Sequence, residues 1–412
     1  MKHLSNIILA VFCLLYAETS AQTTINILSY NLLNFPEGLP LNRQDTLRKI
    51  VNYVEPDLFL IQELKNSLGL SLALDACNDL DGNYTAAQWW SQQSNFGTDF
   101  PLQQSIIYNS DIFGLVEQDF ILTSVRDINY FKLYLKTEDL DHGADTTYLT
   151  VFVTHLKAGS GSSEQQQRAA MVQNFINALP ALSNNQLAIF AGDFNVYNSN
   201  EEAYQMLLST ENAIVFEDPI NAPGTWSSSA YPFKQILTQS TRSSTIYNDG
   251  AGGGVDDRFD FILASQDILS GTEALTYVED SYHALGNNGT CYNQSITSCN
   301  VNNDVPFDII RALYFMSDHL PVVMQLQSES NIQVAEAKKP NVQVASAPGG
   351  IFISSTELVD FTLYDVSGRL ISTFQNQHGG YIQLMNFPIG SYFVVGQSAS
   401  GIPFKAPVIL LK

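Results

Sequence analysis

Six apolar segments of strand length carry, precede or follow a polar side chain that could take part in chemistry. The clearest is Leu187–Glu202, where an apolar run stops at Gly192 and is followed by Asp193 and Asn195. A carboxylate and an amide two residues apart on an extended chain point to the same side, so they can share one ligand. An Asx turn that closes a strand is the simpler explanation when this segment is taken alone.

The same arrangement recurs along the chain. Polar residues follow the apolar runs at 24–30, 57–62 and 147–154. A polar residue lies within the run at 258–263, and two polar residues precede the run at 320–326. Polar side chains at the ends of several strands can meet at one edge of a sheet and form a site on rigid elements. The residues concerned are Asn31, Glu63, His155, Asp260, Asp318 and His319.

These residue types indicate phosphoester hydrolysis assisted by a cation. Glu63 and Asp318, with Asn31, are hard oxygen ligands of the kind that hold Mg²⁺ or Mn²⁺. His319 can serve as a base, because a carboxylate such as Asp260 can fix its tautomer and stabilise its charged form.

The remaining candidates can complete such a reaction. Asp193 and Asn195 can place a nucleophilic water and hold a non-bridging phosphate oxygen, while His155 can supply a proton or a hydrogen bond. Structural explanations stay open: a lone histidine on a strand is more often a hydrogen-bonded structural residue, and Glu63 could pair with a surface cation.

The elements that must position these residues alternate between strand and helix. Leu47, Ile50, Val51 and Val54 recur at helical spacing between two predicted strands, which is how an α/β layer structure begins. Further strands are predicted at 104–108, 128–135 and 148–154, and helices at 66–80 and near 163–179. The polar segments 219–254 and 279–308 are expected to be long surface excursions.

The composition is strongly acidic, and the N-terminus has the features of an export signal. Of 412 residues, 41 are acidic and 19 basic, and the net charge of −22 argues against binding a polyanion through the overall field. Residues 1–21 have the charged start, short apolar run and small cleavage residues of a signal peptide. In an exported chain, Cys291 and Cys299 are expected to form a disulfide, which leaves Cys77 free and buried.

The residue composition changes after the apolar run at 320–326. The predicted domains are residues 22–327, a polar and alanine-rich linker at 328–349, and a small all-β module at 350–412 made of short alternating strands. This module contains no catalytic constellation, so we expect it to serve attachment or addressing.

The motifs SYNLLNF, FLIQEL, VTHLKAG, AGDFN, RFDFIL and SDHLPVV occur in this order between residues 29 and 323. Together they resemble the successive motifs of the endonuclease/exonuclease/phosphatase superfamily, over most of residues 24–327. The resemblance implies a four-layer α/β/β/α sandwich, with two packed sheets flanked by helices and a metal-dependent site at one sheet edge. It also implies in-line attack by water without a covalent enzyme intermediate.

The resemblance also implies roles for individual residues in metal and phosphate binding. Glu63 matches the metal-binding glutamate, Asn31 the asparagine near metal and phosphate, and Asp318 a residue beside the metal. His155 matches the first catalytic histidine of the deoxyribonuclease and sphingomyelinase branches. Arg126 stands where many members have a phosphate-facing arginine.

The second histidine of the family and its neighbours have counterparts as well. Asp193 and Asn195 match the residues that position nucleophile and phosphate. Asp260 matches the partner of the second catalytic histidine, and His319 matches that histidine, which acts on the phosphate or the attacking water. The C-terminal module, with FTLYDVSGRLISTF and GSYFVVG, is similar to the sorting domains of the type IX secretion system in Bacteroidota, so its implied partner is that secretion machinery.

We therefore expect a secreted or cell-surface phosphodiesterase that uses Mg²⁺, with Mn²⁺ or Ca²⁺ as alternatives, and acts on nucleic acid. Alternatives are a phospholipid phosphodiesterase of the sphingomyelinase type, an enzyme for small phosphoesters, and a non-catalytic binding protein on the same fold. A lipid enzyme needs exposed aromatic hairpins, and Trp89 and Trp90 favour it slightly; a nuclease needs cations aimed at phosphates, and Lys157 and Arg168 lie near the motifs.

Overall fold

The computed structural model divides the chain into two compact units, Met1–Gln333 and Val334–Lys412. The predicted signal peptide lies outside the residues that the structure describes. Among the described helices, none is long and apolar enough to cross a membrane. The described residues are 23–80, 82–94, 102–137, 140, 145–182, 186–245, 249–271, 274–299, 305–328, 342–347, 349–355, 358–384, 387–399 and 403–410.

The first sheet of the larger unit has the strand order β11-β13-β1-β2-β4-β3, and β12 also pairs with β13. The strands β1 and β2 are parallel, whereas β13 is antiparallel to β1 and β4 to β2. The bounds are β1 (Thr23–Phe35), β2 (Leu58–Leu64), β3 (Tyr84–Ala86), β4 (Gln103–Asn109), β11 (Leu275–Tyr277), β12 (His283–Ala284) and β13 (Val322–Ser328).

The second sheet has the order β5-β6-β7-β8-β10-β9. Its central strands β7 and β8 are parallel, and β10 is antiparallel to β8. The strand β5, which the sequence analysis did not predict, forms a long hairpin with β6. The bounds are β5 (Phe113–Ile121), β6 (Ile128–Leu135), β7 (Tyr148–His155), β8 (Ala188–Asp193), β9 (Phe216–Glu217) and β10 (Asp260–Ser265).

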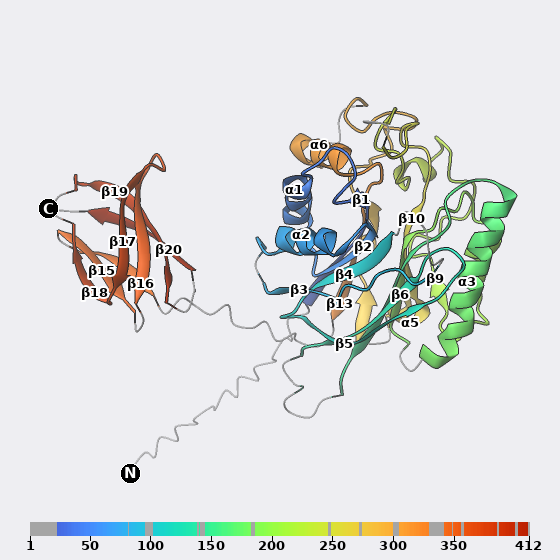
Figure 1. Ribbon diagram of the computed structural model, residues 1–412, viewed down its shortest axis with the longest axis horizontal. Coiled ribbons are helices and arrows are strands. Elements are labelled where there is room, and N and C mark those ends of the chain that lie inside the picture. The colour runs from blue at the N-terminus through green and yellow to red at the C-terminus, as the bar shows by residue number, and fades with distance from the viewer. Residues whose placement is uncertain are drawn as a thin grey trace, which may run out of the picture. The chain divides into compact units, whose positions relative to one another are not determined.

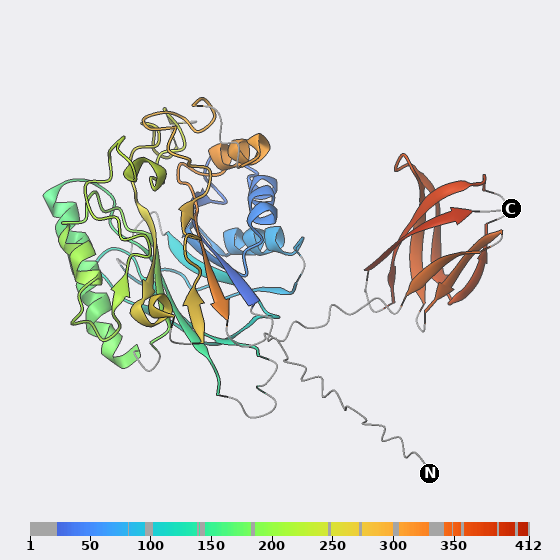
Figure 2. The same cartoon turned by 180° about the vertical axis from the view of Figure 1, so that it is seen from behind.

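Helices cover the outer faces of the two sheets (Figure 1). On one side, Leu47 and Ile50 are buried in the same cluster as Leu28 of β1; on the other, the ring of Phe175 packs on that of Phe190 in β8. The view from behind shows the same separation of α1, α2 and α6 from α3 (Figure 2). The helices are α1 (Gln44–Val54), α2 (Ser67–Cys77), α3 (Ser162–Leu182), α4 (Glu202–Leu207), α5 (Gln266–Ser270), α6 (Phe307–Met316) and the 3₁₀ turn η2 (Phe233–Gln235).

Alternate residues of the strands face inward and form a core between the sheets. Ile25 and Ile27 of β1 share this cluster with Ile189 and Ala191 of β8, and all four are fully buried. Because a strand places successive side chains on opposite faces, the intervening residues pack against the helices instead. The predicted α/β/β/α sandwich is confirmed.

The topology brings several strand ends to one edge of the sandwich. The parallel pairs β1/β2 and β7/β8 end there with their carboxyl termini, whereas β10 begins there because it is antiparallel to β8. In this register His155 and Asp260 both lie opposite Asp193. The polar residues predicted at the strand ends therefore meet.

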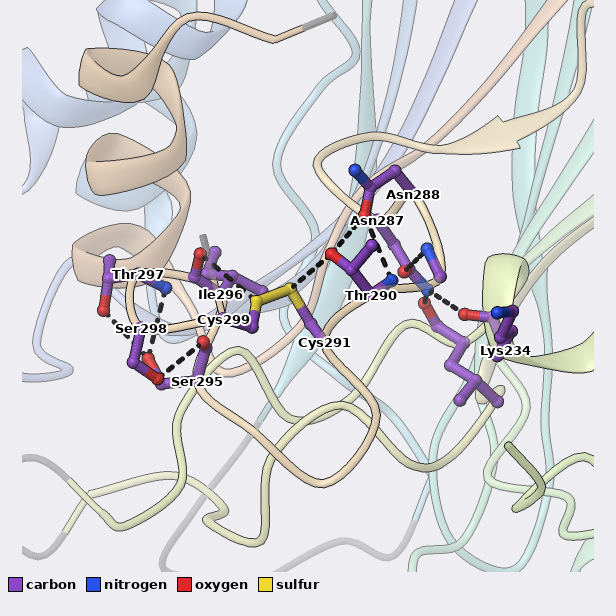
Figure 3. The surroundings of a disulfide bond; sticks show 12 residues. Lys234, Asn287, Asn288, Thr290, Cys291, Ser295, Ile296, Thr297, Ser298 and Cys299 are labelled. Atoms are coloured by element: carbon purple, nitrogen blue, oxygen red, sulfur yellow. Dashed lines mark hydrogen bonds between the residues drawn. A yellow bond between two sulfur atoms is a disulfide. The ribbon is translucent and has the colours of Figure 1, made fainter. Parts of the chain in front are cut away.

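The polar segment at 219–254 is not a surface excursion throughout, so that prediction was wrong in part. Trp226, Thr238 and Arg242 in this segment are fully buried, because they pack against the aromatic core or hydrogen-bond to neighbouring loops. The predicted disulfide is confirmed: Cys291 and Cys299 are bonded and close a short loop (Figure 3), and Cys77 is free and buried.

The smaller unit is a two-sheet β structure with its own core, which includes Ile351, Phe361 and Val394. The sheets have the orders β14-β15-β18 and β17-β16-β19-β20. The predicted linker 328–349 is too long, because β14 lies within it and Val342 and Val344 contact this core. The bounds are β14 (Gln343–Ala347), β15 (Gly350–Ser354), β16 (Val359–Asp365), β17 (Leu370–Gln377), β18 (Gly380–Gln383), β19 (Gly390–Ser398) and β20 (Pro403–Leu410).

Candidate active site

A cavity of about 240 Å³ lies where the strand ends meet. Asn31 and Asp260 are not in its lining, but each hydrogen-bonds to a residue that is. The structure therefore brings together every residue that the sequence analysis proposed for the site. The predicted residues that line the cavity are Glu63, Arg126, His155, Asp193, Asn195, Asp318 and His319.

The ring of His319 is held by a carboxylate on its far side. Its Nδ1 lies 2.8 Å from Asp260 Oδ2, and both side chains are buried. Burial alone would lower the pKa of His319, but the negative charges of Asp260, Asp193 and Asp318 raise it well above the ordinary value. Asp260 thus occupies Nδ1, and the other ring nitrogen, Nε2, lies beside Gln239.

Asp193 lies at the centre of the cluster. Its Oδ2 accepts a hydrogen bond from Asn31 Nδ2 at 3.1 Å and lies 3.5 Å from His155 Nε2 and 3.7 Å from His319 Nε2. Its Oδ1 accepts from the backbone N–H of Asn195. Burial raises the pKa of Asp193, and the neighbouring carboxylates Asp260 and Glu63 act in the same direction. A raised pKa suits a carboxylate that takes up a proton near neutral pH.

Glu63 is fixed by two donors from the first strand. Its Oε1 accepts from Asn31 Nδ2 and its Oε2 from the backbone N–H of Asn34, each at 2.9 Å. Burial raises the pKa of Glu63, and the charge of Asp318 raises it further. Glu63, Asn34 and Asn195 all have a left-handed backbone, with φ of 63°, 52° and 52°. Such conformations cost energy and persist where the surrounding structure enforces them, often at functional sites.

His155 differs from His319 in its surroundings. Burial lowers its pKa well below the ordinary value, and the nearby charges of Arg126, His319 and Lys157 add to that effect. Its Nδ1 lies 3.9 Å from Glu63 Oε1 and has no hydrogen-bond partner among the described residues. Burial therefore favours the neutral form of the His155 ring.

The cations near the site differ in their availability. Arg126 Nη1 donates to the backbone carbonyls of His155 at 3.3 Å and Leu156 at 3.1 Å, which fixes the guanidinium in the cavity wall. Arg168, in contrast, is fully buried and forms an ion pair of 2.6 Å with Glu201. Arg168 therefore supports the fold and cannot reach a substrate.

Gln239 is a cavity-lining residue that the sequence analysis did not identify. Its Nε2 lies 2.6 Å from His319 Nε2 and 3.3 Å from Asp318 Oδ2, and the same Oδ2 accepts from the backbone N–H of Ala251 at 2.6 Å. No feature of the sequence marks Gln239, because it belongs to a polar segment without apolar periodicity.

The donor set of the cavity fits a hard divalent cation. Among the described residues, two groups could share an ion, Glu63–His155–Asp193 and Asp193–Asp260–His319, with their ligand atoms within 4.8 Å of one another. Asp318, which we predicted as a ligand, belongs to neither group, although it lines the same cavity. Carboxylate oxygens buried together repel one another, and a cation would offset that repulsion.

The sequence matches the family described as "Endonuclease/Exonuclease/phosphatase family" over residues 28–319. No curated protein matches it. Several solved structures align with 74% of this chain. One is an endonuclease/exonuclease/phosphatase from Bacteroides vulgatus, with 14% identity, 100% of that chain covered and a TM-score of 0.47. Another is truncated TDP2 from Caenorhabditis elegans, with 18% identity, 98% of that chain covered and a TM-score of 0.45. A third is the human Nocturnin catalytic domain with bound sulfate anion, with 15% identity, 95% of that chain covered and a TM-score of 0.42.

Proposed function

The chain belongs to the endonuclease/exonuclease/phosphatase family, a family of phosphoester hydrolases, and from that premise we propose an exported, magnesium-dependent nuclease. The observation that carries this proposal is the placement of His319. Its Nδ1 is paired with Asp260, while its Nε2 lies 3.7 Å from Asp193 in a cavity that also contains Glu63 and Asp318. General acid–base groups beside hard oxygen ligands are what hydrolysis of a phosphodiester requires.

Each side chain then has a role in one displacement. Asp193 accepts a proton from the attacking water as the water oxygen bonds to phosphorus. The bond to the leaving oxygen breaks, and that oxygen then takes a proton from solvent water. Asn195 and His155 hold the phosphate by hydrogen bonds, and Arg126 faces its negative charge. His319 binds a non-bridging oxygen through Nε2, while Asp260 stabilises the ring in its charged form. No nucleophilic serine or cysteine is needed.

Glu63 is the main residue proposed to hold Mg²⁺, with Asp318 and Asn31 beside it. A Mg²⁺ ion held by these residues would supply positive charge that offsets the negative charge of the phosphate. Mn²⁺ or Ca²⁺ would fit the same oxygen-rich site, because all three ions prefer carboxylate and amide oxygens.

Nucleic acid is the favoured substrate, because the two adjacent tryptophans that favoured a lipid substrate are not fully exposed. Trp89 packs against the hydrophobic core, and the ring of Trp90 contacts that of Phe120 at 5.6 Å between centroids. Both tryptophans are half-buried, so they do not form the exposed aromatic hairpin that membrane contact needs. Arg126, in contrast, is a cation in the cavity wall.

Export and addressing are the remaining parts of the proposal. Residues 1–21 act as a signal peptide, and the β-rich unit that contains β14–β20 is recognised by the type IX secretion machinery, so the enzyme is secreted or held at the cell surface. The disulfide between Cys291 and Cys299 supports export, because such bonds persist in oxidising compartments.

Hydrolysis of a panel of substrates by the mature chain from Gln22 decides between the candidates. Plasmid DNA, RNA and sphingomyelin are each incubated with Mg²⁺, and the products are quantified. Cleavage of nucleic acid is expected. Activity on sphingomyelin alone would replace the nuclease proposal with the lipid phosphodiesterase, and no activity on any of the three would leave a small phosphoester or a binding role.

A further inference from the structure

The side-chain amide of Gln239 lies between two residues of the proposed site. Because Asp260 occupies Nδ1 of His319, Nε2 is the nitrogen that remains for a substrate, and Gln239 Nε2 lies 2.6 Å from it. The same amide nitrogen lies 3.3 Å from Asp318 Oδ2. A side-chain amide has both a donor and an acceptor group, so Gln239 can hydrogen-bond to His319 Nε2 whether or not that nitrogen carries a proton.

The backbone on each side of Gln239 is tied to the strands that carry the site. Thr238 Oγ1 accepts hydrogen bonds of 3.1 Å from the backbone N–H of Phe259 and Asp260. On the other side, the Thr241 N–H donates to the carbonyl of Asp318 at 2.9 Å. The segment 238–241 therefore bridges the start of β10 and the residues that precede β13.

The loop closed by the disulfide is hydrogen-bonded to the segment 238–241. The N–H of Ile296, which lies beside the disulfide (Figure 3), donates to the carbonyl of Thr241 at 3.1 Å. Gly254 accepts from the N–H of Ser240 at 2.7 Å. A Cβ on Gly254 would lie 2.3 Å from the backbone of Asn293, so only glycine lets the two loops approach this closely.

We propose that Gln239 is a positioning residue of the active site, whose amide orients the His319 ring and the Asp318 carboxylate. The loop closed by Cys291 and Cys299 keeps that amide in place. This inference rests on the proposed function and extends it, since the Cys291–Cys299 disulfide then becomes a condition for full activity. An exported nuclease would gain full activity only after it leaves the reducing cytoplasm.

The first test compares Gln239→Met with Gln205→Met. Methionine keeps the length of the side chain and removes both N–H groups. Gln205 is a matched control, because its Nε2 also donates one hydrogen bond, to Ser199, from α4 outside the cavity. We expect Gln239→Met to lower kcat about tenfold or more with KM and melting temperature nearly unchanged, and Gln205→Met to keep wild-type kcat.

A second variant separates hydrogen bonding from space filling. Gln239→Glu keeps the shape of the side chain but adds a negative charge 3.3 Å from Asp318 Oδ2, so its kcat should also fall. Wild-type kcat in either variant would overturn the proposal.

A readout that does not depend on hydrolysis distinguishes failure of this inference from failure of the proposed function. The chain has six histidines, so the ring signals of His319 can be assigned in a histidine-labelled protein by comparison with His319→Ala. These signals should shift in Gln239→Met and stay in place in Gln205→Met. An unshifted His319 signal would contradict the contact even if the protein hydrolysed no phosphodiester.

The supporting role of the loop is tested with the double variant Cys291→Ser/Cys299→Ser. Its kcat should fall as in Gln239→Met, and adding Gln239→Met to it should cost little more, because both changes remove the same constraint. Full activity of the double variant, or additive losses in the combined variant, would show that the disulfide does not act through Gln239.

Discussion

Asp260 Oδ2 lies 2.8 Å from His319 Nδ1, although the two residues are far apart in the sequence. Asp260 is the first residue of β10, and His319 lies just before β13 in the other sheet. Each sheet thus contributes one member of the pair, and their contact exists only when the two sheets are packed at the correct register. The pair links assembly of the sandwich to the reactivity of Nε2.

Asp260→Asn tests this pair. The amide can keep a hydrogen bond to Nδ1 but lacks the charge that holds the pKa of His319 above its ordinary value. We expect kcat to fall about 10²-fold or more while the melting temperature changes little. Asp45→Asn, an exposed change on α1, should leave kcat unchanged. Wild-type kcat in Asp260→Asn would refute a role for this carboxylate.

Glu63→Gln tests the proposed metal site. The amide keeps the shape of the side chain and removes the charge that attracts a cation, so the Mg²⁺ concentration for half-maximal activity should rise about tenfold or more. The measurement is a Mg²⁺ titration of hydrolysis after treatment with chelator. Glu117→Gln on β5, a half-exposed strand of the second sheet, is the control. An unchanged titration curve in Glu63→Gln would place the ion elsewhere.

Asp218→Ala tests a buried ion pair outside the cavity. Asp218 Oδ2 accepts from Arg258 Nη1 at 2.8 Å, and Arg258 is fully buried. Removing the carboxylate leaves a buried charge without its partner, which should cost about 3–5 kcal/mol of unfolding free energy. Asp45→Ala, which removes an exposed pair with Arg48, should have little effect. Chemical denaturation measures both.

The same pair predicts a pH dependence of stability. Burial alone would raise the pKa of Asp218, but Arg258 and the hydrogen bonds from Arg258 and Tyr204 lower it below the ordinary value. A group whose pKa is lowered in the folded state stabilises the protein at pH values above its unfolded pKa of about 3.9. This contribution to stability is lost as the pH falls through the folded pKa. The stability difference between wild type and Asp218→Ala should therefore shrink in acid; a constant difference would contradict this explanation.

Removal of the C-terminal unit should leave hydrolysis intact. The unit has a separate hydrophobic core, and the residues of the cavity all lie between 33 and 319. A chain of residues 22–333 should therefore show the kcat and KM of the full mature chain, and only its export should fail. A large loss of kcat in the purified truncated chain would show that the unit contributes to the site.

The strand-end residues could be predicted from the sequence because a buried strand leaves a clear apolar run and its last polar residue stands out. Asp193 and His155 are of this kind. Gln239 could not be predicted, because its position depends on hydrogen bonds between distant loops. Arg242 was missed for a similar reason, since a polar residue in a polar segment gives no sign that it is buried. In the predicted linker, β14 was missed because a strand of five residues is too short to give a clear alternating pattern.

Hydrolysis of plasmid DNA by the mature chain and by His319→Ala, each with Mg²⁺ and with chelator, tests whether His319 and a bound cation together support the reaction. His283→Ala, an exposed histidine of β12, serves as the matched variant. We predict cleavage by wild type and His283→Ala that chelator abolishes, and a loss of about 10²- to 10⁴-fold in His319→Ala with its fold retained. Cleavage by folded His319→Ala at the wild-type rate, or cleavage that persists in chelator, would contradict the proposed chemistry.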